Sequence, residues 1–154
     1  MATEYYFRLN SGLTPEEALH LLAGETGLAR NDKGNIVHPD TAIWINSIEA
    51  LPMTREIFEE AFLFEPTLSI TFWINKFRPA YDEGMKLMMR CVQFLLDQEK
   101  SDAVLLFSNE IVVLQRIQGE LLLNQELFKS PNYEQLLPFL KIAYQLRLLK
   151  QSLL

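Results

Sequence analysis

Cysteine is almost absent from this 154-residue sequence, which contains only Cys91. A lone cysteine cannot form an intrachain disulfide, so nothing in the sequence favours an oxidising compartment. Histidine is equally scarce, since His20 and His38 are the only two and both are distant from Cys91 in the sequence. A zinc site needs three or four such ligands at defined spacing, so we predict no metal site.

Glycine-rich and catalytic motifs are also missing. The six glycines form neither a dinucleotide-binding pattern nor a phosphate-binding loop, and no serine lies in a nucleophile-elbow motif. The segment 31–34 lacks the alternating acidic ligands of a calcium loop. Neighbouring carboxylates, as in Glu16 and Glu17 or Glu59 and Glu60, point about 100° apart on a helix and cannot share a substrate. We therefore predict no cofactor and no enzymatic activity.

Long apolar runs and clusters of positive charge are absent as well. No apolar stretch approaches the roughly 20 residues that cross a bilayer, and the N-terminus lacks the basic and apolar regions of a signal peptide. Fourteen basic against twenty acidic residues give a net charge of −6. This balance argues against nucleic-acid and anionic-membrane partners and is compatible with a basic protein partner. The expected location is the cytoplasm.

The residues that are present indicate a globular protein. An apolar share of 49% with 22% charged residues is typical of a packed domain, and we predict a single domain over residues 1–154. Thr14, Pro15 and Glu17 form a strong helix start with a capping box, and Gly24 or Gly27 ends that helix. Further helices are predicted at 53–62 and 79–99, with a C-terminal helical region at about 130–154. Strands are predicted at 5–9, 41–48, 67–75, 103–107, 111–117 and 120–123.

This order of elements predicts an α+β fold. The last three strands are joined by short turns and must pair antiparallel. We expect a single, mostly antiparallel sheet of about six strands with helices packed on one face and the other face partly wet. Pro138 is expected to kink or divide the C-terminal helical region.

The wet face of this sheet is the candidate site. If the aliphatic residues of each strand claim the core, alternation places Trp44, Trp73, Tyr6 and Arg8 together on the opposite face. A polar face with Trp, Tyr and Arg has the composition of a protein-binding hot spot. The alternative is that these aromatics pack beneath a loop or the C-terminal helix. The leucine-rich end, 141–154, has three interpretations: a helix that docks on the protein's own core, a dimer contact, or a helix that binds a partner.

Several segments resemble one bacterial family. These are 13–17 with its leucine-rich helix, 64–67 leading into a strand that ends at Lys76 and Phe77, and the stretch 102–124. From residue 4 to about 125 the chain is similar to the immunity proteins of the myxobacterial swarming-inhibition (Sit) toxin system. The resemblance implies binding and steric blockade of a cognate toxin without catalysis, and it supplies no individual site residues.

Four functional hypotheses stay open at this point. The first is a non-catalytic immunity or antitoxin-like protein, for which a toxin gene immediately upstream is the discriminating observation. The second is a dimeric, client-binding protein similar to type III secretion chaperones, which a solution monomer argues against. The third is an enzyme with an unrecognised site, which requires a deep pocket with converging polar groups. The fourth is an interaction protein whose role is unknown.

Overall fold

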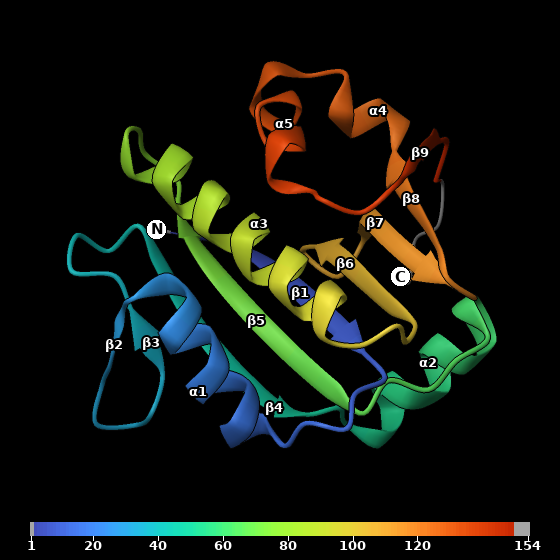
Figure 1. The fold of residues 1–154 in the computed structure, drawn as a ribbon, viewed down its shortest axis with the longest axis horizontal. Helices are drawn as coiled ribbons and strands as arrows, with labels where there is room; N and C mark the ends of the chain where they lie inside the picture. The colour runs from blue at the N-terminus through green and yellow to red at the C-terminus, as the bar shows by residue number, and fades with distance from the viewer. Residues whose placement is uncertain (1, 150–154) are drawn as a thin grey trace.

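The computed structural model describes residues 2–149, and within them the chain forms one nine-stranded sheet with helices on both faces (Figure 1). The sheet order is β2-β3-β4-β5-β1-β6-β7-β8-β9, with β1 in the centre. The strands are β1 (Ala2–Leu9), β2 (Ala29–Arg30), β3 (Ile36–Val37), β4 (Ile43–Glu49), β5 (Leu68–Asn75), β6 (Ala103–Phe107), β7 (Ile111–Ile117), β8 (Glu120–Asn124) and β9 (Gln145–Arg147). The helices are α1 (Pro15–Thr26), α2 (Pro52–Phe62), α3 (Ala80–Gln98), α4 (Gln125–Phe128) and α5 (Pro131–Glu134), with a 3-10 turn, η1 (Leu137–Phe139).

The predicted α+β class is confirmed, but the predicted number of about six strands is too low. All six predicted strands are present, and every neighbouring pair is antiparallel except β8 with β9. Two of the additional strands, β2 and β3, are two residues long. Alternation cannot be recognised over two residues, so neither of these strands was predicted.

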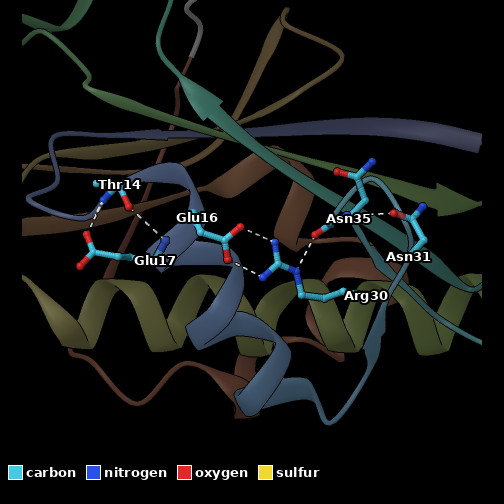
Figure 2. Close-up of polar contacts among 7 residues, drawn as sticks. Thr14, Glu16, Glu17, Arg30, Asn31 and Asn35 are labelled. Carbon is cyan, nitrogen blue, oxygen red and sulfur yellow. Dashed lines mark hydrogen bonds and ion pairs between the residues drawn. The ribbon is translucent and has the colours of Figure 1, made fainter.

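Helix α1 begins where the capping box predicts. The Thr14 side chain accepts from the Glu17 backbone, and the Glu17 carboxylate accepts from the Thr14 backbone (Figure 2). Gly27 ends the helix at a φ of 72°. Figure 2 also shows Arg30, at the end of β2, reaching Glu16 in the first turn of α1 with an Nη2 to Oε1 distance of 2.7 Å. The β2–β3 hairpin is thereby attached to α1.

The main core lies between the sheet and helices α1 and α3, which cover the face turned to the viewer in Figure 1. Helix α3 comes very close to the sheet at Gly84. A Cβ atom at this position would lie 2.4 Å from the Ala42 carbonyl oxygen and 2.9 Å from Cγ2 of Ile74. Only glycine fits there, so Gly84 sets the distance between α3 and strands β4 and β5.

A second apolar cluster lies on the opposite face, which corrects the prediction that helices cover one face only. Phe58 and Phe62 of α2, with Phe64, pack against three residues of β6 and β7, which are Val104, Leu106 and Val112. Strand β6 is therefore buried on both sides, because Ala103 and Leu105 belong to the main core. Its uninterrupted apolar sequence is typical of a strand covered on both faces.

The end of α2 contains a strained residue. Leu63 takes a left-handed φ of 64° and its side chain is 79% exposed. A left-handed conformation costs a residue with a Cβ atom about 1 kcal/mol or more, and glycine avoids this cost. We therefore expect Leu63→Gly to raise the free energy of unfolding by about 1 kcal/mol in urea titrations. An unchanged or lower free energy would contradict the strain.

The C-terminal helical region is not a long helix. Between residues 125 and 149 the structure has the one-turn helices α4 and α5, the turn η1 and strand β9, which pairs parallel to β8. Pro131 begins α5 and Pro138 lies within η1. Proline lacks an N–H and disfavours a helical residue before it, so a continuous helix through 138 is unfavourable. Residues 150–154 of the predicted region lie outside the described residues.

The short helix α5 is attached to the core through a pair of tyrosines. The hydroxyls of Tyr5 and Tyr133 are 2.7 Å apart and buried. Burial raises the pKa of both phenols, that of Tyr133 to about 12, and each hydroxyl lies against the other. Both side chains stay neutral in the folded protein at pH values where an unfolded tyrosine ionises.

This pair predicts alkaline destabilisation. The folded state holds these protons above the ordinary tyrosine pKa of 10.0, so the unfolded state binds fewer protons and stability falls as pH rises from about 10. We expect the free energy of unfolding to decrease between about pH 10 and 12 in a urea series. The variant Tyr5→Phe/Tyr133→Phe should show a shallower decrease, and an equal slope in both proteins would contradict this assignment.

Candidate partner-binding face

The four predicted site residues lie on one face of the sheet, opposite the α1–α3 core. Trp44 of β4 faces Trp73 of β5, while Tyr6 and Arg8 of β1 pair with the small polar residues of β5. All four side chains are half-buried. The alternation of each strand therefore gives the grouping that the sequence predicts. We call these four residues, with Glu4, the aromatic row.

The two tryptophans are in direct contact. Their ring centroids are 4.3 Å apart with a tilt of 39°. The indole Nε1 of Trp73 donates to Oε1 of Glu4 at 3.0 Å, and the hydroxyl of Tyr6 donates to the other oxygen of the same carboxylate. Glu4 thus fixes the orientation of both aromatic side chains. Glu4 was not among the predicted site residues, although it lies two residues before Tyr6 and so on the same face of the strand.

Arg8 is held by contacts within the protein. Its Nη1 donates to Oδ1 of Asn109 at 2.7 Å and its Nε to Oγ of Ser69 at 3.3 Å. Its guanidinium carbon lies 4.8 Å from the centroid of the Tyr6 ring and 5.6 Å from that of Phe58 in α2. Burial lowers the pKa of Arg8. The Arg8 end of the row is therefore partly covered by α2.

The Trp end of the row borders a shallow hollow. The hollow has a volume of about 530 Å³ and is bounded by the two tryptophans together with Ala2, Asn31, Val37, Thr41, Ile43 and Asn75. Its lining combines apolar side chains with the polar Asn31, Thr41 and Asn75, a combination typical of a surface that receives a side chain of another protein. The Trp73 indole is already oriented by Glu4, and Trp44 packs against it, so a partner would meet a preorganised surface.

The groups that serve chemistry elsewhere have structural roles here. Cys91 is fully buried, and burial raises the pKa of its thiol to about 12, so it is not a nucleophile. The buried guanidinium of Arg116 donates to the carbonyl oxygens of Leu96 and Ser101 at 2.8 and 2.9 Å, which satisfies the end of α3. Among residues 2–149, no three acidic, histidine or cysteine side chains are placed to hold a metal ion.

A second hollow lies between α3 and the C-terminal segment. It has a volume of about 480 Å³, and its residues include Phe94, Phe139, Glu25 and Arg90. The Arg90 Nη2 donates to the Glu25 carbonyl oxygen at 2.9 Å and lies 3.7 Å from its carboxylate. These charges satisfy each other rather than converging on the hollow.

In the part of the chain described, no helix is long and apolar enough to cross a membrane.

The comparison with known families agrees with the resemblance found in the sequence. A family model described as SitI3-like matches residues 3–133. The match covers the range of 4 to about 125 expected from the sequence, and it includes every residue of the aromatic row. It ends before β9. No curated protein and no solved structure matches the chain.

Proposed function

The chain belongs to the SitI3-like family, and from that membership we propose that it is an immunity protein that neutralises a cognate toxin by binding to it. The protein acts without catalysis and, as the sequence predicts, in the cytoplasm. The partner is a protein, and neither a cofactor, nucleic acid nor a membrane takes part.

The observation that carries this proposal is the half-exposed Trp44–Trp73 pair beside its hollow. Tryptophan, tyrosine and arginine dominate binding energy at protein interfaces, and they act best where they are held in place before binding. Here Trp73 and Tyr6 share the carboxylate of Glu4. We assign the contact with the toxin to Trp44 and Trp73, with Tyr6 and Arg8 supporting them from β1.

Steric blockade follows from this arrangement. A binding protein needs no reactive group, because covering the toxin's substrate site is sufficient to stop its activity. The net charge of −6 also favours encounter with a basic toxin over an acidic one. A homodimeric, chaperone-like protein remains the alternative, and it requires that the protein dimerises without a toxin present.

Co-expression tests the proposal. The gene immediately upstream, where an immunity protein is expected to have its toxin, is induced in a bacterial host with and without the gene for this protein. We expect growth to stop with the toxin alone and to continue when both are present. An enzymatically inactive toxin variant controls for the burden of expression. Growth arrest in the presence of well-expressed, folded protein would contradict the proposal.

A further inference from the structure

Exposed apolar side chains concentrate on α2 and its two ends. Of the ten large apolar side chains exposed within residues 2–149, half lie between residues 48 and 63. Met53 is 72% exposed and Leu63 is 79% exposed. We call this surface the α2 strip, and its apolar members are Ile48, Leu51, Met53, Ile57 and Leu63.

The strip follows helical geometry. Met53, Glu56, Ile57 and Glu60 have the i, i+3, i+4, i+7 spacing that places residues on one side of a helix. All four are exposed, whereas Phe58 lies on the other side of α2 and is fully buried against the sheet. The outer side of α2 thus presents apolar and acidic side chains in alternation.

The charge of the strip has one sign. Segment 48–65 contains five glutamates, which are Glu49, Glu56, Glu59, Glu60 and Glu65, and a single basic residue, Arg55. All five glutamates are exposed, and within the described residues none of them lies in an ion pair. The strip therefore offers unneutralised negative charge beside its apolar side chains.

These features act against the stability of α2. Glu59 and Glu60 lie in the last turns of the helix, where no basic residue accompanies them. Negative charge near a helix C-terminus is unfavourable, since the helix dipole is negative at that end. Leu63 adds the strain of its left-handed backbone. Neither feature therefore serves the stability of α2.

We propose that the α2 strip is a docking surface for a basic segment of a partner protein, with apolar side chains between its Lys and Arg residues. In the cell this segment belongs to the toxin, a step that rests on the proposed function. The strip lies on the same side of the sheet as the aromatic row, because Phe58 of α2 contacts Arg8. One partner can therefore reach both surfaces.

Charge complementarity selects this occupant. A second copy of the chain would place glutamates against glutamates, and an anionic membrane would be repelled by the same residues. A basic amphipathic segment neutralises the five carboxylates while its apolar side chains cover Met53, Ile57 and Leu63. Basic side chains of the segment thus meet the glutamates, and its apolar side chains meet the apolar residues of the strip.

A peptide titration tests the inference without knowledge of the toxin. The full-length protein, labelled with nitrogen-15, is titrated with a Lys/Leu amphipathic helical peptide of about 14 residues, roughly four turns, at about 0.15 M salt. A Glu/Leu peptide of the same pattern is the control. We expect the Lys/Leu peptide alone to shift the amide signals of residues 48–65. No shift, shifts centred elsewhere, equal shifts with the Glu/Leu peptide, or concentration-dependent self-association through the strip would overturn the proposal.

Two variants make the titration specific. Glu59→Lys/Glu60→Lys reverses charge on the strip, and we expect it to weaken peptide binding at least about 10-fold. Glu120→Lys/Glu134→Lys changes the same net charge at exposed positions outside the strip and should bind nearly as the wild type does. Equal weakening by both variants would mean that net charge alone drives binding, and the docking surface would be rejected.

Leu63→Gly adds a readout that separates stability from binding. We expect this variant to unfold at higher urea concentration and yet to bind the Lys/Leu peptide more weakly. The proposed function fails separately from this inference: a toxin that is not neutralised while the peptide binds the strip removes the first and keeps the second. If the toxin is neutralised, strip variants do not change neutralisation and the peptide does not bind, the proposed function is kept and the docking surface is rejected.

Discussion

Trp73→Ala is expected to weaken binding of the cognate toxin about 30-fold or more, which corresponds to about 2 kcal/mol. The indole of Trp73 contacts Trp44 at a centroid distance of 4.3 Å and borders the hollow. Its removal takes away the anchor and leaves Trp44 without its neighbour. Isothermal titration calorimetry with an enzymatically inactive toxin measures the change in affinity.

The fold should survive this substitution, because Trp73 is half-buried and lies outside both apolar clusters. Tyr144→Ala is the matched control, since Tyr144 is an aromatic residue with 37% exposure near β9, beyond the family match. Trp73→Phe keeps an aromatic ring but loses the hydrogen bond to Glu4, so we expect an intermediate affinity. Wild-type affinity in Trp73→Ala, or its unfolding, would remove the aromatic row from the interface.

Gly84→Ala is expected to destabilise the protein by about 3 kcal/mol, the upper part of the range for overpacked cores. The new methyl group would meet the Ala42 carbonyl oxygen at 2.4 Å, and this oxygen cannot move aside cheaply because it accepts a hydrogen bond from the Asn75 N–H at the end of β5. Ile74, at 2.9 Å, is fully buried and also has no space to yield. Urea unfolding followed by circular dichroism measures the loss.

Gly24→Ala provides the matched control for Gly84→Ala. Gly24 lies inside α1, and a Cβ atom there meets nothing within 4 Å. Alanine is the better helix former by about 0.5–1 kcal/mol, so this variant should be more stable than the wild type. If the two variants shift the free energy of unfolding in the same direction, the close contact between α3 and the sheet at Gly84 is contradicted.

Gly84 also bears on the binding face. Ile74 and Ala42, which it contacts, neighbour Trp73 and the start of β4, so a displaced strand would move the tryptophan pair on the opposite face. We expect Gly84→Ala to lower toxin affinity as well as stability, whereas Trp73→Ala lowers affinity alone.

The parts of the fold that local chemistry determines were predictable. Thr14 and Glu17 identify the start of α1 because a capping box needs only residues three apart. Likewise, the alternation of β5 places Trp73 opposite Ile74 whatever the rest of the chain does. The grouping of the aromatic row on one face follows from such alternation in three strands.

Features that depend on distant contacts were not predictable in the same way. The leucine-rich segment around Leu146 reads as a helix, but in the structure it forms β9, because pairing with β8 satisfies its backbone. The position of α2 across the sheet from α1 depends on Val104 and Leu106, which are far from it in the sequence. The α2 strip and the cover over Arg8 follow from that placement, so sequence alone did not reveal them.

The most direct test of neutralisation by binding is whether the purified protein forms a complex with a purified, enzymatically inactive form of the candidate toxin, the product of the gene immediately upstream. Calorimetry and size-exclusion chromatography with light scattering should show tight, stoichiometric binding and a single species of the combined mass. Two separate species, with no heat of binding at micromolar concentrations, would contradict neutralisation by direct contact.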